Sequence, residues 1–325
     1  MKNNIKIGIV GGAGYTAGEL LRLLLNHPQA EIQFVYSSTQ ANTPVYYTHR
    51  DLLGETELKF TDKLSEVDVI FLCLGHGLSA EFLEQNQLSE NTRIIDLSND
   101  FRVQSTHGNR HFVYGLSEIF RDEIATATNI ANPGCFATAI QLALFPLAKQ
   151  SLLTDDVHVN AITGSTGAGR GFAETLHYSN RNNNVSIYKP FTHQHLGEIN
   201  KTLNVVQKEK EVTLNFIPVR GSFTRGIFTS LYTKCRLSKD ALLALFRECY
   251  ASHPFTHVSD MEISLKDVVN TNKCLLHIDK HGDHVLITSI IDNLLKGASG
   301  QAVQNMNLMF GLDETTGLHL KPSAF

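Results

Sequence analysis

Short apolar runs alternate with stretches of helical spacing in the first part of the chain. The runs lie at residues 5–10, 32–36, 67–74 and 93–97, and their length and branched apolar side chains are typical of buried strands. Helical spacing follows the first run, where one apolar face is made by Ala17, Leu20, Leu21 and Leu24. A second helix is expected after the third run, up to about residue 88. Strands that alternate with helices predict an α/β fold.

Longer strands follow in the second part of the chain. They are predicted at residues 157–163, 212–219, 227–234, 273–279 and 284–291, the last two as a β-hairpin. Helices are predicted to begin within residues 191–199, after Ser238 and after Gly300, and the polar stretch 177–184 is expected to be a loop. We expect two domains, at residues 1–133 and 134–298, with a C-terminal helix at about 299–325 that packs back on the first domain.

Composition and charge exclude several classes of function. The 325 residues are 42% hydrophobic and 18% charged with a net charge of −4, which is typical of a globular protein. The charges are mixed and no basic stripe is present, so we expect no nucleic-acid partner. No apolar run approaches a membrane span and no signal peptide is expected. Five scattered cysteines without metal-ligand spacing predict a cytoplasmic protein with no metal site.

A glycine-rich turn follows the first predicted strand and precedes the first predicted helix. It contains Gly11, Gly12, Ala13, Gly14, Tyr15 and Thr16. Glycines in this context let the backbone approach a pyrophosphate, which rests on the helix N-terminus. The second strand ends in Ser37 and Ser38, where an NAD-selecting fold places a carboxylate for the ribose 2′-hydroxyl. The sequence therefore predicts a dinucleotide-binding domain and favours NADP.

The turn Asn132-Pro133-Gly134 leads directly into a predicted helix at Cys135. The helix is expected to be amphipathic, with one face made by Phe136, Ala139, Ile140, Ala143, Leu144 and Leu147. Unpaired N–H groups at a helix N-terminus favour an anion, and such positions bring the pKa of a cysteine down to roughly 3.5–7.5. The other four cysteines lie inside apolar patterns and are interpreted as buried hydrophobes. Cys135 is the candidate nucleophile.

Three further groups of residues are candidates for the site. Arg102 follows a predicted strand, where an arginine can clamp an anionic substrate, although loop arginines are more often solvated. Gly164, Gly167, Ala168 and Gly169 form a loop that permits close backbone approach to a ligand or simply a tight turn. His193 and His195 are a poor metal pair at a spacing of two, but either can act as a general acid or base.

These segments together resemble the N-acetyl-γ-glutamyl-phosphate reductase family, related to aspartate-semialdehyde dehydrogenase, nearly from end to end. Gly11–Leu20 is similar to G-A-S-G-Y-x-G-A-E-L, Asp96–Arg102 to D-L-S-A-D-F-R, and Asn132–Thr138 to N-P-G-C-Y-A-T. Thr163–Arg170 is similar to S-G-x-S-G-A-G-R and His193–Ile199 to H-x-H-x-P-E-I. The chain departs from the pattern at Gly197, which replaces proline, and at Val219-Arg220, where some relatives read His-Leu.

The resemblance implies an α/β protein with a Rossmann-type NADP-binding domain and an α+β catalytic and dimerisation domain of the glyceraldehyde-3-phosphate dehydrogenase-like type. It implies that Cys135 attacks an acyl phosphate, that NADPH reduces the thioester, and that His195, or else His193, handles protons. Arg102 and Arg225 are implied to hold the substrate phosphate and α-carboxylate, with the order open. Asn132 and Arg220 are further candidates for substrate contact; Arg220 is a departure from the family pattern, and it either reads an acyl carboxylate or points to solvent or pairs with a local acid. The glycine loop from Gly164 is implied to line the nicotinamide. We expect a homodimer or homotetramer.

Three alternatives stay open at this point. The first is the same reaction on an N-succinyl substrate, since Arg220 would give a free carboxylate a partner. The second is a related acyl-phosphate reductase such as aspartate-semialdehyde dehydrogenase. The third is a catalytically silent Rossmann-type binding protein.

Overall fold

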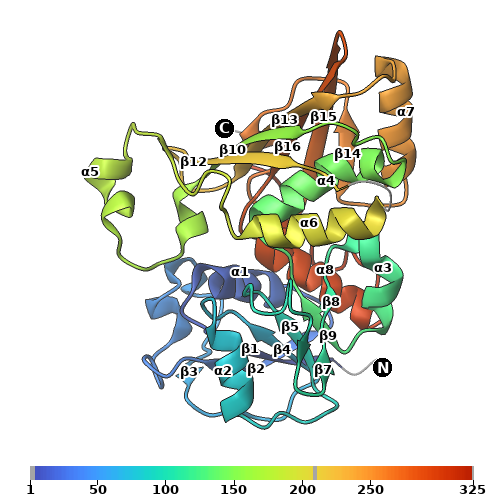
Figure 1. The fold of residues 1–325 in the computed structure, drawn as a ribbon. Helices are drawn as coiled ribbons and strands as arrows, with labels where there is room; N and C mark the ends of the chain where they lie inside the picture. The colour runs from blue at the N-terminus through green and yellow to red at the C-terminus, as the bar shows by residue number, and fades with distance from the viewer. Residues whose placement is uncertain (1–3, 208–210, 324–325) are drawn as a thin grey trace. The chain divides into compact units, whose positions relative to one another are not determined.

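The structure, a computed structural model, describes residues 4–207 and 211–323. The chain folds into two compact units (Figure 1). Unit 1 comprises Met1–Gly134 and Ala298–His319, and unit 2 comprises Cys135–Gly297 and Leu320–Phe325. Cys135 is thus the first residue of unit 2. No helix among the described residues has the length and apolar character to cross a bilayer.

Unit 1 is built on a parallel sheet with the strand order β3-β2-β1-β4-β5-β9-β8. Its strands are β1 (Ile5–Val10), β2 (Ala30–Tyr36), β3 (Phe60–Thr61), β4 (Val69–Leu72), β5 (Arg93–Asp96), β8 (Val113–Tyr114) and β9 (Asn129–Ala131). A small hairpin is formed by β6 (Thr106–His107) and β7 (Arg110–His111). Successive strands are added on one side of β1 up to β3 and on its other side from β4 onward. In open α/β sheets, dinucleotides bind outside the carboxyl ends of the strands at the point where the strand order switches sides in this way.

The helices of unit 1 are α1 (Tyr15–Leu24), α2 (Leu78–Gln85), α3 (Ser117–Thr126) and α8 (Gly300–Met309), with short 3₁₀ turns η1 (Val45–Tyr47) and η2 (Arg50–Leu52). The predicted apolar face of α1 is confirmed, since all four of its residues are buried. The C-terminal helix is shorter than predicted, because it ends at Met309 and Gly311 follows with φ +64°. The residues from Leu320 group with unit 2, where the Ser323 N–H donates to Val269 O, and residues 324–325 lie outside the described residues.

Unit 2 is built on a mixed sheet with the strand order β11-β12-β10-β13-β16-β15-β14. Its strands are β10 (Val157–Thr163), β11 (Ser186–Ile187), β12 (Leu214–Arg220), β13 (Ile227–Lys234), β14 (Thr256–Ser259), β15 (Cys274–His281) and β16 (His284–Ile291). The predicted hairpin is confirmed as the antiparallel pair β15–β16. Buried residues alternate with more exposed ones along β10 and β13, so one face of the sheet carries the core.

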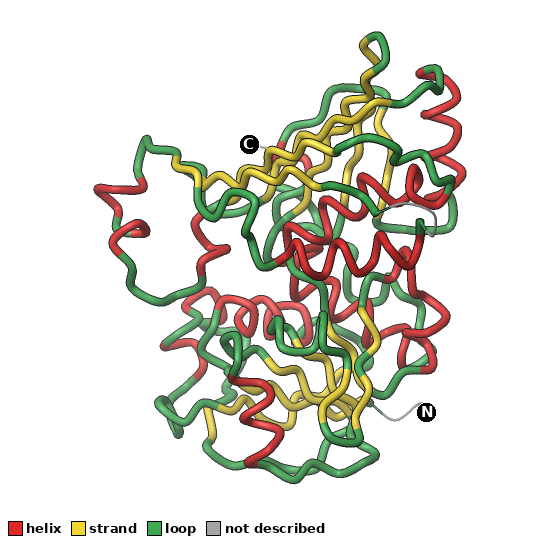
Figure 2. The backbone as a smooth tube through the Cα atoms, in the orientation of Figure 1, coloured by secondary structure: helices red, strands yellow, loops and turns green. Residues whose placement is uncertain are grey.

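The helices of unit 2 are α4 (Cys135–Lys149), α5 (Tyr178–Arg181), α6 (His195–Val206) and α7 (Lys239–Tyr250). Short turns are η3 (Ser165–Ala168), η4 (Glu174–Leu176), η5 (Leu265–Asp267) and the π-helical turn η6 (Leu295–Ser299). The α4 and α7 helices pack against strands of the sheet, and α6 packs against α4 (Figure 2).

Two predictions for the helices of unit 2 were wrong. The predicted one-sided α4 is buried on every side from Phe136 to Ala148, because it packs on α6, α7 and three strands of the sheet. The stretch 177–184, expected as a loop, contains the single helical turn α5, which the His177 side chain caps by accepting from the Ser179 N–H.

Candidate active site

The glycine turn of unit 1 leads from β1 into α1. Gly11 has φ +78°, and a Cβ there would lie 2.5 Å from the Cys73 carbonyl oxygen, so only glycine fits. The Gly12 N–H donates to Tyr36 O at 2.9 Å, and α1 begins at Tyr15 with Gly14 as its N-cap. The N-terminus of α1 thus follows the glycine turn directly, and a helix N-terminus in this position is where a phosphate binds.

Ser37 and Ser38 follow β2, the neighbour of β1 in the sheet. Ser37 is buried, with its hydroxyl 3.5 Å from that of Thr39 and its N–H bonded to Thr61 O. Ser38 is exposed. Both serines thus lie at the carboxyl end of β2, where the selection of NAD or NADP takes place in this type of fold.

The turn before Cys135 is held by unit 1 at several points. The Asn132 N–H donates to Asp96 O at 2.8 Å, and its side-chain amide donates to Ala298 O at 3.0 Å. Arg102 is 5% exposed and donates from Nε to Asn132 O and from Nη2 to Leu97 O, both at 2.9 Å. The structure thus gives Arg102 and Asn132 a part in fixing the backbone of this turn; their contact with substrate stays a prediction.

Cys135 is the first residue of α4 and is partly exposed. Gly297 of η6 lies directly against it, since a Cβ on Gly297 would be 2.7 Å from the Cβ of Cys135. The other cysteines have different surroundings: Cys235 and Cys274 are buried, and burial raises the pKa of Cys73 to about 12 and that of Cys249 to about 11. These four thiols are protonated at neutral pH or inaccessible, which leaves Cys135 as the candidate nucleophile.

The two histidines lie together beside the residue that follows the cysteine. His193 and His195 are 4% and 6% exposed, with ring centroids 4.6 Å apart, and both rings meet Phe136 edge-on. His193 Nδ1 accepts the backbone N–H of His195 at 3.2 Å, so its proton is on Nε2 when the ring is neutral. His195 Nε2 lies 3.9 Å from Glu198 Oε1.

The glycine loop of unit 2 is hydrogen-bonded to the loop that carries Arg225. Gly164 N–H donates to Gly226 O, and Thr166 N–H and hydroxyl both donate to Thr224 O. Gly164 is buried, whereas Gly167, Ala168 and Gly169 are exposed at the tip. The structure therefore leaves the predicted ligand-contacting part of this loop open to solvent.

Arg225 is oriented by an acid that sequence reasoning missed. Its Nε and Nη2 donate to the two oxygens of Asp292 at 3.0 and 3.1 Å, and Asp292 is fully buried. Asn293, the next residue, accepts from Gly226 N–H and donates to the Thr166 hydroxyl. The only signal in the sequence is a polar Asp-Asn pair directly after the apolar strand β16.

Arg220 lies at the end of β12 and packs on Tyr188, a second residue that sequence reasoning missed. The guanidinium carbon is 4.3 Å from the centroid of the Tyr188 ring, and Nη1 donates to the Thr175 hydroxyl at 3.2 Å. The Tyr188 ring is also 5.7 Å from the His193 ring. Burial, and then the charge of Cys135, raise the pKa of Tyr188, so the phenol keeps its proton and remains a hydrogen-bond donor.

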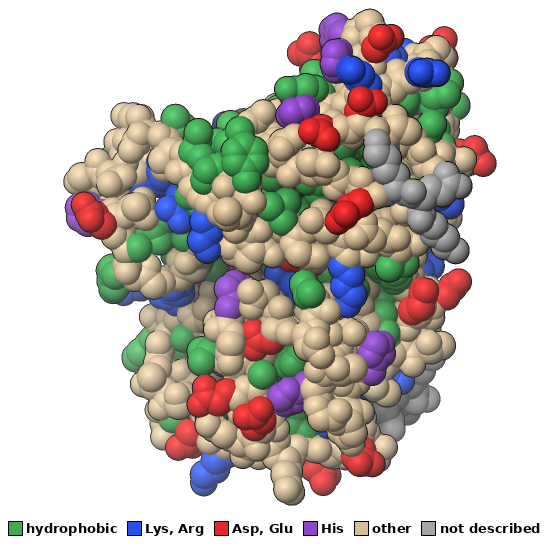
Figure 3. All heavy atoms as spheres, viewed as in Figure 1, with side chains coloured by type: hydrophobic (Ala, Val, Ile, Leu, Met, Phe, Trp, Pro, Cys, Tyr) green, Lys and Arg blue, Asp and Glu red, His purple; other side chains and the backbone are tan. Residues whose placement is uncertain are grey.

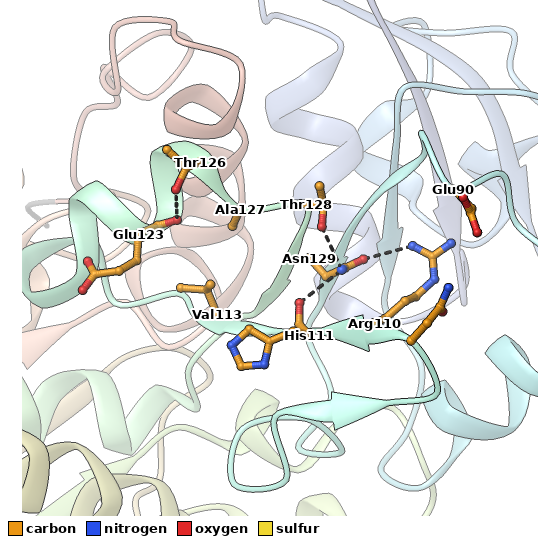
Figure 4. Close-up of a pocket in the computed structure, with 10 residues that line it drawn as sticks. Glu90, Arg110, His111, Val113, Glu123, Thr126, Ala127, Thr128 and Asn129 are labelled. Atoms are coloured by element: carbon orange, nitrogen blue, oxygen red, sulfur yellow. Dashed lines mark hydrogen bonds between the residues drawn. The ribbon is translucent and has the colours of Figure 1, made fainter.

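A pocket of about 600 Å³ in unit 1 is separate from all these residues (Figure 4). Its lining includes Arg110, His111 and Glu123, but the Arg110 guanidinium already donates to Asn129 Oδ1 and Ser89 O. None of the residues predicted for the site lines it. Among the described residues, no group of three or more His, Cys, Asp or Glu side chains is arranged to hold a metal ion.

Known proteins match this chain over its whole length. It is 58% identical to the N-acetyl-γ-glutamyl-phosphate reductase of Flavobacterium johnsoniae and 56% identical to that of Parabacteroides distasonis, over 99% of this chain and 100% of each relative. The chain belongs to the N-acetyl-γ-glutamyl-phosphate reductase family. It is accordingly an enzyme, and the resemblance noted in the sequence is confirmed.

Two known domain families match successive parts of this chain, and solved structures share its fold. Residues 6–127 match the semialdehyde dehydrogenase NAD-binding domain, and residues 135–293 match the semialdehyde dehydrogenase dimerisation domain. Aspartate semialdehyde dehydrogenase II from Vibrio cholerae has the same fold at 15% identity, with a TM-score of 0.73 over 95% of this chain and 99% of that one. The Candida albicans enzyme, solved with NADP, matches at 13% identity with a TM-score of 0.70, over 95% and 99%. Unit 1 therefore binds a nicotinamide dinucleotide, and a dimerisation domain indicates a homo-oligomer.

Proposed function

We propose that this enzyme reduces N-acetyl-γ-glutamyl phosphate with NADPH to N-acetylglutamate semialdehyde and phosphate, a step of arginine biosynthesis. The observation that carries the proposal is Cys135 at the N-terminus of α4, followed by Phe136, on which both buried histidines pack. The relatives named as this reductase support the choice of substrate.

The cysteine supplies covalent catalysis. The Cys135 thiolate attacks the acyl carbon of the acyl phosphate, the bond from carbon to the phosphate oxygen breaks, and inorganic phosphate leaves a thioester on Cys135. NADPH would supply, when bound, the hydride that the thioester carbon needs. His195 would take the hydroxyl proton of the thiohemiacetal as the bond to Cys135 breaks, which releases the aldehyde and the thiolate. The helix N-terminus favours the thiolate both as nucleophile and as leaving group.

The glycine turn fits a dinucleotide, because there is no room for a Cβ at Gly11 and a bare glycine backbone lets a pyrophosphate come close. Gly11, Gly12, Ala13 and Gly14, with Tyr15 and Thr16 at the start of α1, would hold the pyrophosphate. Ser37 and Ser38 would meet a 2′-phosphate, which favours NADP. The loop residues Gly164, Gly167, Ala168 and Gly169 are proposed for the nicotinamide side.

Side chains of unit 2 are proposed to move the proton and hold the anions. We assign the general acid/base to His195, whose Nε2 is near Glu198, and a supporting role to His193, whose Nδ1 holds the His195 backbone. Arg225, fixed by Asp292, and Arg102 with Asn132 are proposed for the phosphate and α-carboxylate, in either order.

An N-succinyl substrate is the second candidate, favoured by the contacts of Arg220. Its partners are the Tyr188 ring and the Thr175 hydroxyl, and neither carries a negative charge. The carboxylate of an N-succinyl group would supply that charge, whereas an N-acetyl group would not. A homodimer or homotetramer and a cytoplasmic location complete the proposal.

The proposal is tested in the reverse direction, with phosphate and NADP⁺ supplied to N-acetylglutamate, N-succinylglutamate and aspartate semialdehydes. We expect NADPH formation with an N-acylglutamate semialdehyde that Cys135→Ala abolishes without loss of NADPH binding. Cys249→Ala is the matched control and should keep its turnover. Turnover by Cys135→Ala, or preference for aspartate semialdehyde, would refute the proposal. Arg220→Leu in the same assay decides between the two acyl groups.

A further inference from the structure

His49 of unit 1 is a buried histidine to which the proposed reaction gives no role. It is 7% exposed and lies between η1 and η2, in the connection from β2 to β3. Its ring Nε2 is 2.8 Å from the carbonyl oxygen of Gly12. A carbonyl oxygen can only accept a hydrogen bond, so Nε2 carries the proton and donates it. His49 thus holds a residue of the glycine turn that lies 37 positions earlier in the chain.

A glycine inside α1 makes room for the His49 ring. Gly18 lies within the helix, where glycine is less favourable than alanine, and it is not among the glycines with positive φ. A Cβ on Gly18 would lie 2.5 Å from Nδ1 of His49 and 2.9 Å from its Cε1. The family pattern G-A-S-G-Y-x-G-A-E-L has alanine at this position. The glycine is therefore explained by the neighbouring ring rather than by the backbone conformation.

The His49 side chain is fixed from several sides. Its backbone N–H donates to Val45 O, and its carbonyl oxygen accepts from the Leu52 N–H, both at 3.0 Å. The centroid of its ring is 6.3 Å from that of Phe60, which is 1% exposed. The ring therefore lies between Phe60 and α1, and its hydrogen bond to the glycine turn is part of the folded structure of unit 1.

Gly12 is held at both of its backbone polar groups. Its N–H donates to O of Tyr36, the last residue of β2, at 2.9 Å, and its carbonyl oxygen accepts from His49. A trans peptide unit is planar, so the Ala13 N–H points away from the Gly12 carbonyl oxygen. The bond from His49 therefore also sets the direction of that N–H. A Cβ on Gly12 would lie 2.5 Å from Cγ1 of Val35, so the turn is closely packed here.

We propose that His49 is a positioning residue for the dinucleotide cofactor. The inference rests on the proposed function, in which the glycine turn and the N-terminus of α1 hold the pyrophosphate. A carbonyl oxygen that faced the pyrophosphate would repel its negative charge. By binding the Gly12 carbonyl oxygen, His49 keeps this oxygen turned toward itself and orients the peptide that follows. His49 thereby acts on the affinity for the cofactor and not on hydride transfer.

The first test removes the donor of His49. His49→Leu should raise the Kd of NADPH roughly 2–10-fold, the scale of one lost hydrogen bond. His49→Gln, whose amide can place a donor near the position of Nε2, should restore most of the affinity. Titration with NADPH, followed by the fluorescence of the nucleotide, measures Kd without substrate. In the reductase assay the KM for NADPH should rise, while kcat changes by less than about twofold.

The second test fills the space beside the ring. Gly18→Ala should raise the Kd of NADPH in the same range, although alanine favours the helix, because the new methyl group displaces the His49 ring. Both changes act through one hydrogen bond, so Gly18→Ala combined with His49→Leu should bind NADPH about as well as either single variant. A combined increase in Kd that equals the product of the two single increases would contradict this coupling.

His27→Leu is the matched control. His27 is 4% exposed, and its Nε2 is hydrogen-bonded to Asn307 Oδ1 at 3.0 Å. It precedes β2 beside the first residues of β1 and β2, whereas the glycine turn follows the last residue of β1. His27→Leu should lower the free energy of unfolding in urea and leave the Kd of NADPH unchanged, since it removes a buried hydrogen bond remote from the turn.

Circular dichroism identifies the folded variants, and Gly18→Ala carries the test if His49→Leu does not fold. A Kd in His49→Leu and Gly18→Ala equal to that of the parent would overturn the role of His49, and so would an equal loss of affinity in His27→Leu. A parent that binds neither NADPH nor NADH would instead refute the cofactor assignment of the proposed function. The two failures are therefore seen separately.

Discussion

At the scale of single residues, Asp292 organises the side of unit 2 that carries Arg225. Besides both bonds from Arg225, its carboxylate accepts the backbone N–H groups of Asn270, Leu294 and Leu295. Burying a carboxylate is costly unless hydrogen-bond donors and a cation surround it, and Asp292 has both. The Arg225 side chain is thereby fixed in orientation.

We predict that Asp292 acts on substrate through Arg225. Asp292→Asn and Arg225→Lys should each lower kcat/KM roughly 10–150-fold, the scale of a lost charge-assisted hydrogen bond, and the double variant should be little worse than either. Steady-state kinetics on the four proteins give the coupling. Asp279→Asn, which breaks a partly exposed pair with Lys239, is the matched control and should leave kcat/KM unchanged. Additive effects of the two changes would contradict a shared role.

Sequence reasoning at this scale proposes candidate reactive residues but misses the residues that orient their neighbours. Cys135 is such a candidate because its residue type and its place at a helix start are both local properties. Asp292 is 67 residues from Arg225, and Tyr188 reaches its neighbours across β11 and β12. Contacts between residues this far apart in the sequence depend on the order of the strands in the sheet. Residue type and spacing do not reveal that order.

At the scale of elements, the hydrophobic pattern predicts whether a segment is a helix or a strand, and where it begins and ends, best when the element buries only one face. β10 has the predicted bounds, and the glycine turn, α1 and the β15–β16 hairpin are confirmed. α4 differed because apolar spacing reveals only the apolar positions. Its polar residues Thr138 and Gln141 are also fully buried, and their burial depends on neighbours that are distant in sequence. Very short strands such as β8 and β9 have too few residues to show a period.

The β2 strand gives the prediction that belongs to this scale. Ser38 is exposed at the end of β2, so an aspartate there should repel a 2′-phosphate and accept the ribose hydroxyls instead. Ser38→Asp is expected to lower kcat/KM for NADPH relative to NADH by at least about fivefold, since a charge–charge contact near a surface is worth roughly 1–4 kcal/mol.

The measurement for Ser38 is the ratio of kcat/KM values for the two cofactors. Ser38→Ala serves as the control, because it removes the hydroxyl without adding a charge, and it should change the ratio far less. An unmodified enzyme that uses both cofactors equally would contradict the assignment of NADP.

At the scale of the whole molecule, unit 1 is assembled from two distant segments of the chain. Residues 298–319 close the unit that residues 1–134 begin, and α8 packs on α1 and α3. Several amide side chains of α8 are fully buried, among them Gln304, Asn305 and Asn307. They are buried because they meet polar groups of the first segment, as Asn307 Oδ1 meets the His27 ring at 3.0 Å. The sequence of α8 predicts its apolar face but not these long-range partners.

Acidic and basic side chains are interspersed on the face of the molecule shown in Figure 3. This agrees with the mixed charge of the sequence and the net charge of −4. The distant segments of unit 1 are joined by specific contacts, among them the Arg121–Glu314 ion pair and the buried hydrogen bonds of Asn305.

Asn305 makes the bonds whose loss should be most informative. Its Nδ2 donates to Gly115 O at 2.9 Å and to Asn132 Oδ1 at 3.1 Å, joining α8 to the chain 190 and 173 residues earlier. Gly115 lies so close that a Cβ on it would be 2.5 Å from that Nδ2. Asn305→Ala leaves a buried carbonyl and a buried amide without this donor, so it should lower the free energy of unfolding by roughly 1–3 kcal/mol.

Urea unfolding followed by circular dichroism measures the effect of Asn305→Ala. Asn91→Ala removes an exposed amide from the same unit and should change the free energy of unfolding by less than about 0.5 kcal/mol. Because Asn132 begins the turn that leads to Cys135, turnover of Asn305→Ala should fall as well, even under conditions where the variant is fully folded. Equal unfolding midpoints for the two variants would contradict a stabilising role of the Asn305 hydrogen bonds.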